Sequence, residues 1–345
     1  MLDTLVGNER AKETLRRMLR QGRVPGALLF AGEEGLGKKS FALELARALN
    51  CRDKRGDEGC GLCPACLRIG KFHYPKSDDR DEFKKIIWSE HRDVGLVLPY
   101  NRNILVDAVR ELERESNFRP AEGNARVFIV EKAENLTDAS ANALLKTLEE
   151  APPTTHIILI TPRPSSLLPT IRSRCQTVRF APLAAGELES FLVDNGQRAG
   201  AEARLAAQLS SGRPGIALGL NLDTYRARRD AMLVVVEALA SGGGDRVRLL
   251  RAAEELGDAK NKDEYEPRLD TLEILVRDLW LLALGGGGVL VNQDLSERLA
   301  RLAEGVRPAR AAGWLTRIEE LRGQLSFNVN RRAATDALFL SMSAD

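Results

Sequence analysis

The sequence of 345 residues lacks a strong net charge, a long apolar run and an N-terminal export signal. Lys and Arg number 51 and Asp and Glu 49, so the strongly basic composition of a dedicated nucleic-acid-binding chain is absent, although a local basic face is compatible with these numbers. The stretch MLDTLVGNERAKETL has no apolar core that could serve as a signal peptide, and no later stretch is long enough to span a bilayer. We therefore expect a cytoplasmic protein without a membrane partner, long enough for two or three domains.

Cysteine is also scarce, but four of the five cysteines lie within sixteen positions. In a chain without an export signal, such a cluster argues for metal binding rather than for disulfides. The turn-forming residues Gly59, Gly61 and Pro64 let the sulfurs converge on one ion, as a tetrahedral zinc site with four thiolates requires. Two alternatives stay open: an iron–sulfur cluster, although its usual downstream Cys-Pro is missing, and buried thiols without a ligand. The predicted zinc ligands are Cys51, Cys60, Cys63 and Cys66.

The stretch AGEEGLGKKS nearly matches a phosphate-binding loop. The consensus G-x-x-x-x-G-K-[ST] begins at Gly32 and reaches Gly37 and Lys38, but Lys39 stands where a hydroxyl should ligate Mg²⁺. An ammonium is a donor only and cannot ligate a metal ion. The flanking residues predict a buried strand before the loop and a helix from Lys38 to about Asn50 after it. In that arrangement, the backbone N–H groups of the loop converge on an anion.

A second buried strand is predicted at Val127–Val130, followed by Glu131 and Lys132. P-loop ATPases of this kind need an acid there that holds the Mg²⁺ shell, and then a Glu that orients water. Glu131 can reach a metal with its longer arm, but Lys132 cannot act as the base. Together with Lys39, this pattern predicts a site that has lost Mg²⁺-dependent hydrolysis. Two questions stay open: whether ATP or ADP still binds, and whether Lys39 replaces the Mg²⁺ charge.

Motifs spread over most of the chain resemble one known family. A helix predicted at Asp138–Glu150 contains NALLKTLEE, and the triplet SRC follows it at residues 173–175. GNERAKETLRRML, GALLFAGEEGLGKKS and LVRDLWLLALGGGGVLVNQDL belong to the same pattern. Together they resemble bacterial DNA polymerase III clamp-loader subunits of the AAA+ superfamily. The resemblance implies an α/β P-loop (AAA+) domain with a parallel sheet, followed by a small helical lid domain and an all-α C-terminal collar domain.

The expected domain bounds combine this resemblance with local patterns. The charged stretch at residues 77–93 predicts an irregular surface excursion, and a further helix is predicted from about Val106 to Ser116. Arg226, Arg228 and Arg229 are expected on a solvated helix face and receive no role. The predicted domains are 1–181 with the zinc insertion at 51–66, 182–222 as the lid and 223–345 as the collar.

Two types of clamp-loader subunit must be separated, the ATP-hydrolysing gamma/tau motor and the delta-prime type. The motor type carries Lys-Thr in the P-loop and Asp-Glu after the second strand, where this chain has Lys-Lys and Glu-Lys. A sensor arginine of the motor should fall near Gly215, but Arg213 is two residues away and precedes a proline. Thr161 does occupy the other sensor position, at the polar end of a strand. The chain therefore is more similar to the delta-prime type.

The resemblance also implies residue roles and partners. Arg174 of SRC corresponds to an arginine finger that reaches the nucleotide of the neighbouring subunit. Arg172 lies nearby and could be mistaken for the finger in mutational tests. Clamp-loader subunits with this cysteine insertion bind structural zinc. The expected partners are gamma/tau and delta subunits in a hetero-pentamer, with the sliding clamp and primed DNA reached through the complex. Candidate contacts of the degenerate nucleotide site are Gly32, Gly35, Gly37, Lys38 and Thr161.

The expected function is that of a non-hydrolysing partner in ATP-dependent loading of the sliding clamp onto primed DNA during replication. Two other functions stay open. One is an ATP-hydrolysing gamma-type motor that tolerates Lys39 and Lys132. The other is a free-standing zinc-dependent nucleic-acid-binding protein, against which the near-neutral charge speaks.

Overall fold

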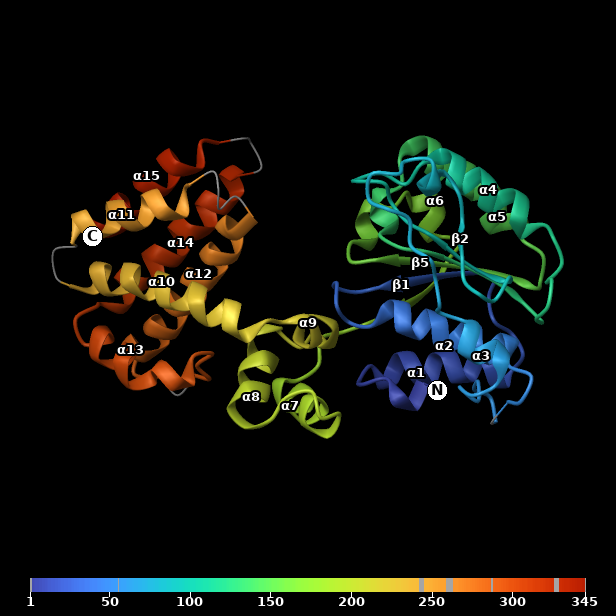
Figure 1. The fold of residues 1–345 in the computed structure, drawn as a ribbon, viewed down its shortest axis with the longest axis horizontal. Helices are drawn as coiled ribbons and strands as arrows, with labels where there is room; N and C mark the ends of the chain where they lie inside the picture. Colours follow the sequence, from blue (N-terminus) through green and yellow to red (C-terminus); the bar gives the residue numbers. More distant parts are fainter. Residues whose placement is uncertain are drawn as a thin grey trace. The chain divides into compact units, whose positions relative to one another are not determined.

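The computed structural model describes residues 2–54, 56–241, 245–258, 263–286, 288–325 and 329–344. The chain divides into two compact units, Met1–Gly219 and Leu220–Asp345 (Figure 1). The predicted further division of the first unit near residue 181, into a P-loop domain and a lid, stays a prediction. None of the helices within the described ranges is long and apolar enough to cross a membrane.

The first unit is built on a six-stranded sheet with the strand order β2-β3-β4-β5-β1-β6. All neighbouring strands run parallel except β2, which pairs antiparallel with β3. Strands β1, β3, β4 and β5 are buried along their whole length, as expected for parallel strands covered on both faces. The predicted α/β fold with a parallel sheet is confirmed. The strands are β1 Ala27–Ala31, β2 Ile87–Trp88, β3 Val94–Val97, β4 Arg126–Val130, β5 Thr155–Thr161 and β6 Gln176–Arg179.

Helices cover both faces of this sheet (Figure 1). On one face Leu15 and Phe41 pack against Phe30, and on the other Leu112 and Leu144 pack in the cluster that contains the β4 and β5 side chains. The first face carries α1 Glu9–Arg20, α2 Lys38–Asn50 and α3 Pro64–Arg68, and the second carries α4 Val106–Ser116, α5 Asp138–Glu150 and α6 Pro169–Arg172. Short 3-10 helices are η1 Leu2–Thr4, η2 Glu82–Lys84, η3 Ala133–Asn135 and η4 Pro164–Ser166.

The helices predicted from local signals occur at the predicted residues. α5 begins where Thr137 Oγ1 accepts a hydrogen bond of 3.2 Å from Ser140 N, which satisfies one of the free N–H groups of the first turn. A pair of prolines follows Ala151 and prevents its continuation. One expectation was incomplete: the stretch at 77–93 is not wholly irregular, because Ile87–Trp88 forms the antiparallel edge strand β2.

Three short helices complete the first unit after the sheet: α7 Ala185–Asp194, α8 Gly200–Leu209 and α9 Pro214–Gly219. Leu183 N donates to Gly212 O at 2.8 Å, and Gly215 N donates to Gly35 O at 2.8 Å. The second hydrogen bond joins the start of α9 to the phosphate-binding loop.

The second unit is entirely helical within the described residues, which confirms the predicted all-α C-terminal part. Its core contains Leu239, Leu272, Trp314 and Phe339, and Trp314 Nε1 donates to Met342 O at 2.9 Å. Its elements are α10 Leu222–Ala240, α11 Arg246–Leu256, α12 Tyr265–Ala283, η6 Gln293–Leu295, α13 Ser296–Ala303, α14 Pro308–Leu325 and α15 Arg331–Ser343.

The expectation of a solvated arginine face on α10 is wrong for Arg229. Its side chain is buried, and Nη1 donates to both carboxylate oxygens of Asp294, at 2.7 and 2.9 Å. Close by, the fully buried Asp278 accepts hydrogen bonds from the backbone N–H groups of Val291 and Asn292. Asp278 of the motif LVRD…VNQD therefore holds the backbone at Val291 and Asn292 against α12.

Candidate functional site

The loop between β1 and α2 depends on its glycines. Gly35 and Gly37 have φ of +83° and +80°, in the left-handed region that favours glycine. A Cβ atom on Gly35 would also come within 2.7 Å of Ile216 Cγ1, because α9 packs on this loop. The loop therefore requires glycine at these two positions, and α9 packs against it at Gly35.

A cavity of about 280 Å³ lies at the carboxyl ends of β1, β4 and β5. Among the predicted nucleotide contacts, Gly35, Gly37 and Lys38 line it. Gly32 and Thr161 pair at the same edge, where Gly32 N donates to Thr161 O at 3.2 Å, and Thr161 is fully buried. The fold thus brings these five residues to one edge of the sheet, and their contact with a nucleotide stays a prediction.

The P-loop lysine is bonded to its own loop. Lys38 Nζ donates to the carbonyl oxygens of Gly32 and Glu33. Burial lowers the pKa of Lys38, and the nearby Glu34 and Glu134 oppose that shift. The ammonium that would meet a phosphate is therefore supplied with acceptors by the protein itself.

Lys39 forms an ion pair with the acid that follows β4. Its Nζ lies 2.6 Å from Glu131 Oε1 and donates to the Tyr74 hydroxyl at 2.8 Å. The same ammonium lies 5.1 Å from the ring centroid of Tyr74 and 5.7 Å from that of Phe72, within range of a cation–π contact. Burial lowers the pKa of Lys39, but hydrogen bonds with Glu131 and Tyr74 outweigh it and raise the pKa above its ordinary value. Lys39 is therefore charged at neutral pH, and it neutralises the residue that could have held Mg²⁺.

The remaining basic residues at the cavity pair with acids of the loop. Lys132 Nζ lies 3.8 Å from Glu34, and Arg213 Nη1 lies 3.9 Å from Glu33. Sequence patterns had pointed to both lysine replacements but not to the aromatic residues over Lys39. Tyr74 and Phe72 lie more than thirty positions away in the chain and belong to no nucleotide motif, so only the three-dimensional structure brings them to the site.

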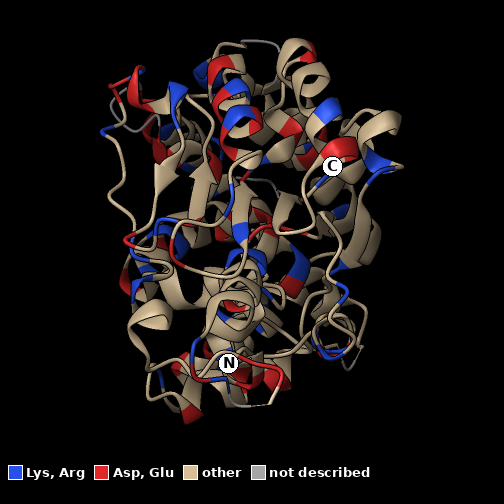
Figure 2. Cartoon of the chain, turned by 90° about the vertical axis from the view of Figure 1, so that its right-hand side faces the viewer, with Lys and Arg blue, Asp and Glu red and all other residues tan. Residues whose placement is uncertain are grey.

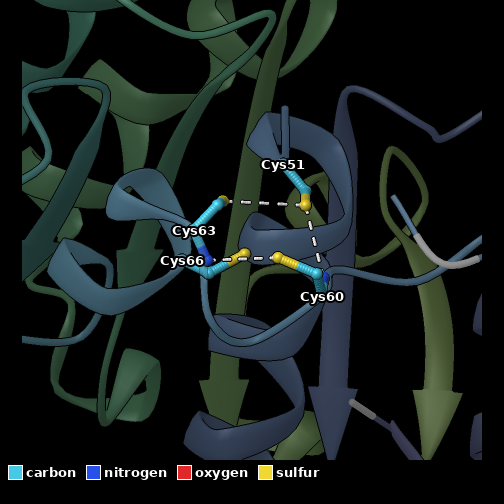
Figure 3. Close-up of side chains that lie close together, drawn as sticks. All are labelled: Cys51, Cys60, Cys63 and Cys66. Atoms are coloured by element: carbon cyan, nitrogen blue, oxygen red, sulfur yellow. Dashed lines mark hydrogen bonds between the residues drawn. The ribbon is translucent and has the colours of Figure 1, made fainter. Parts of the chain in front are cut away.

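The four clustered cysteines come together on the α2 side of the sheet, with all sulfur atoms within 4.8 Å of one another (Figure 3). Cys51 ends α2, and Cys66 lies within the short helix α3. The Sγ atoms of Cys51 and Cys63 are 3.8 Å apart, which matches the edge of about 3.8 Å expected for a tetrahedron of Zn–S bonds of about 2.3 Å. The cluster can therefore bind a metal ion, and its all-sulfur donor set fits zinc.

Backbone N–H groups favour the thiolate form in this cluster. Cys60 Sγ accepts hydrogen bonds from Leu62 N at 3.4 Å and Cys63 N at 3.2 Å, and Cys51 Sγ accepts one from Cys60 N at 3.3 Å. Burial raises the pKa of Cys51 and Cys66. Burial also acts to raise the pKa of Cys63, but hydrogen bonds from the backbone of Cys66 and Arg52 outweigh this effect and lower the pKa to about 6. Such N–H donors stabilise the charged sulfur that a metal requires.

The cysteine segment is fastened to the rest of the first unit by polar contacts. Arg47 of α2 donates to Cys66 O at 3.1 Å and to Ile69 O at 2.9 Å. Arg68 donates to both carboxylate oxygens of Glu122, and these hydrogen bonds lower the pKa of Glu122 to about 2. A metal in the cluster would therefore stabilise contacts between α2, α3 and the loop before β4.

Arg174 lies between α6 and β6. Cys175 beside it is buried in the core under α5, and burial raises the pKa of its thiol to about 12. The Arg174 side chain is 36% exposed, contacts Glu149 of α5 through Nε and Nη2, and donates from Nη1 to Thr170 O at 2.9 Å. Cys175 thus anchors the segment while Arg174 faces solvent.

The fold and the site together define a P-loop protein in which lysine stands at the position of the metal-binding hydroxyl and at that of the water-orienting acid. A family model described as DNA polymerase III, delta subunit, matches residues 7–184. The delta' subunit of Escherichia coli K12 is 32% identical over 91% of this chain and 86% of its own length, and that of Bacillus subtilis 168 is 27% identical over 96% and 95%. The chain belongs to the family of DNA polymerase III delta' subunits, which confirms the predicted delta-prime type. A gamma/tau subunit of Mycobacterium tuberculosis H37Rv is 34% identical, but over only 54% of this chain and 30% of its own length.

Elemental analysis of the purified protein should find about one zinc per chain, since four thiolates complete a tetrahedral site. Cys63→Ser should release the metal and lower the hydrogen-exchange protection of residues 51–69, while residues 223–345 keep theirs. Cys175→Ser is the matched control and should retain the zinc, because Cys175 lies outside the cluster. Stoichiometric iron with visible absorbance would show that the zinc assignment is wrong.

The purified chain should hydrolyse no ATP above background, because Lys39 is paired with Glu131, the carboxylate that a metal ion would need as a ligand. The double variant Lys39→Thr, Lys132→Glu should bind ATP with Mg²⁺ in a calorimetric titration, yet turn over little without the missing sensor arginine. Lys146→Thr on α5 is the control and should bind as the unmodified chain does. Robust ATP turnover by the unmodified chain would overturn this account.

Proposed function

We propose that this protein is the non-hydrolysing member of a clamp loader and supplies Arg174 to the nucleotide held by a neighbouring gamma/tau subunit. It assembles with gamma/tau and delta subunits in a hetero-pentamer in the cytoplasm. Through that complex it assists ATP-dependent loading of the sliding clamp onto primed DNA during replication. Residues 182–222 act as the lid and 223–345 as the collar that joins the subunits.

The observation that carries the proposal is the position of Arg174 relative to its own P-loop. β1 and β6 run parallel, with Leu28 paired to Gln176, so Arg174 precedes β6 at the amino edge of the sheet. The P-loop starts at Gly32, beyond the carboxyl end of β1. From the Leu28–Gln176 pair to Gly32, four residue steps of strand span about 13 Å, and Arg174 lies two residues before Gln176. This position places Arg174 away from the cavity of its own subunit, which supports a role at a nucleotide held by another subunit.

The lysine pairings support the absence of hydrolysis by this subunit. A P-loop ATPase needs a metal ion between a hydroxyl and an acid, and an acid that orients water. Here Lys39 and Glu131 neutralise each other, and Lys132 stands at the place of the second acid. These pairings speak against the gamma-type motor. They leave the loop able to stabilise the fold without a metal.

Zinc is proposed as a structural ion. Four cysteines fill all positions of a tetrahedral site and leave none for a substrate or water. The rival of a free-standing nucleic-acid-binding protein finds little support: in the view of Figure 2, basic and acidic residues are interspersed along the ribbon. Near-neutral composition agrees with this distribution.

Arg174→Ala should leave the subunit folded and able to join the loader, but should slow clamp- and DNA-stimulated ATP hydrolysis. Arginine fingers in related phosphoryl-transfer systems contribute about a thousandfold or more, and because several motor sites share the work, we expect a smaller bulk loss. Arg174→Lys should not restore the rate, since an ammonium lacks the planar donor fork. The measurement is steady-state hydrolysis by the reconstituted complex.

Arg172→Ala is the matched control, because Arg172 is exposed and lies two residues away in the same segment. Its effect should be mild. If both arginine variants assemble and leave hydrolysis and clamp loading unchanged, the trans role is wrong and the subunit is only a structural partner.

A further inference from the structure

The guanidinium of Arg174 is engaged within its own subunit. Nε and Nη2 both contact Glu149 Oε1, and Nη1 donates to the carbonyl oxygen of Thr170. Each of the three nitrogens thus has a partner already. Glu149 is the penultimate residue of α5, and Thr170 belongs to α6, so two separate elements hold the side chain.

These contacts compete with the binding of a phosphate. An arginine binds phosphate oxygens best through two parallel N–H bonds from one edge of the guanidinium. Glu149 takes the edge formed by Nε and Nη2. On the other edge, formed by Nη1 and Nη2, Nη1 donates to Thr170 O. A phosphate can bind by the Nε–Nη2 edge only after the carboxylate has been displaced, and the contacts with Glu149 and Thr170 fix the direction in which the other edge points.

The ion pair is suited to being reversible. The side chains of Arg174 and Glu149 are 36% and 44% exposed, and pairs of this kind in water contribute little net stability. The last turn of α5 adds a modest attraction, because the free carbonyl groups at a helix C-terminus favour a cation. A phosphate group with several charged oxygens in a closed interface can outcompete one solvated carboxylate.

We propose that Glu149 is a positioning residue that holds Arg174 away from the neighbouring nucleotide until the subunit interface closes. This inference rests on the proposed function, since it takes Arg174 as the finger. Glu149 then acts as a restraint on hydrolysis in the loader that has not yet met clamp and DNA. The carboxylate does not touch the reacting phosphate and works through Arg174 alone.

The test compares Glu149→Ala with Glu150→Ala, which removes the same charge from the next residue of α5. In the reconstituted loader without clamp or DNA, Glu149→Ala should raise ATP hydrolysis about two- to fivefold, the range expected for loss of an exposed ion pair. Glu150→Ala should leave the rate unchanged. Added salt should narrow the difference, because it screens the pair in the unmodified subunit. The double variant Glu149→Ala, Arg174→Ala should behave as Arg174→Ala does.

A second measurement uses the isolated subunit. Phenylglyoxal labelling followed by peptide mass spectrometry should modify Arg174 faster in Glu149→Ala than in the unmodified protein or in Glu150→Ala. If Arg174→Ala slows the loader while Glu149→Ala changes neither hydrolysis nor labelling, the restraint is wrong and the finger stands. A slower loader with Glu149→Ala also overturns the restraint, because Glu149 would then align Arg174 for catalysis. If Arg174→Ala itself has no effect, the proposed function fails and the restraint fails with it.

Discussion

The parallel pairing of β1 with its two neighbours is the constraint on which the functional features of this protein depend. Pairing with β5 puts the carboxyl end of β1, with its glycine-rich loop, beside the ends of β5 and β4. Pairing with β6 puts the segment that carries Arg174 at the opposite edge of the sheet. The same sheet therefore carries, at one edge, a cavity whose lysines pair with acids of this subunit and, at the other edge, an arginine. In the proposed function, a subunit with this division depends on a neighbour for its chemistry.

The acid at the end of β4 is neutralised by the protein itself. Lys39 brings a permanent cation to Glu131, where a motor would bring Mg²⁺ with its nucleotide. The aromatic residues over Lys39, Phe72 and Tyr74, come from the chain just after the cysteine segment. A loop that is complete without ligand no longer has to change with the nucleotide state. This fits a member of the complex that serves as a fixed partner.

Features coded by nearby residues could be predicted from the sequence. The helices at Lys38–Asn50 and Asp138–Glu150 follow from periodicity, a cap and flanking glycine or proline, and all of these signals are local. The four cysteines were predictable as a cluster because their short spacings in the sequence keep the sulfur atoms close together. Contacts between distant residues were not predictable in this way. Neither the burial of Arg229 against Asp294 nor the contact of Arg174 with Glu149 leaves a periodic trace, because each depends on how separate helices pack.

The central claim, that this subunit closes its own site and serves its neighbour's, is tested most directly by a structure of the assembled loader with an ATP mimic, clamp and primed DNA. The account predicts that Lys39 remains paired with Glu131 and that no metal binds there. It also predicts that an Arg174 nitrogen lies within about 3.2 Å of the terminal phosphate oxygens in the adjacent subunit. Mg²⁺ and nucleotide bound at Glu131 of this subunit, with Arg174 still on Glu149, would contradict it.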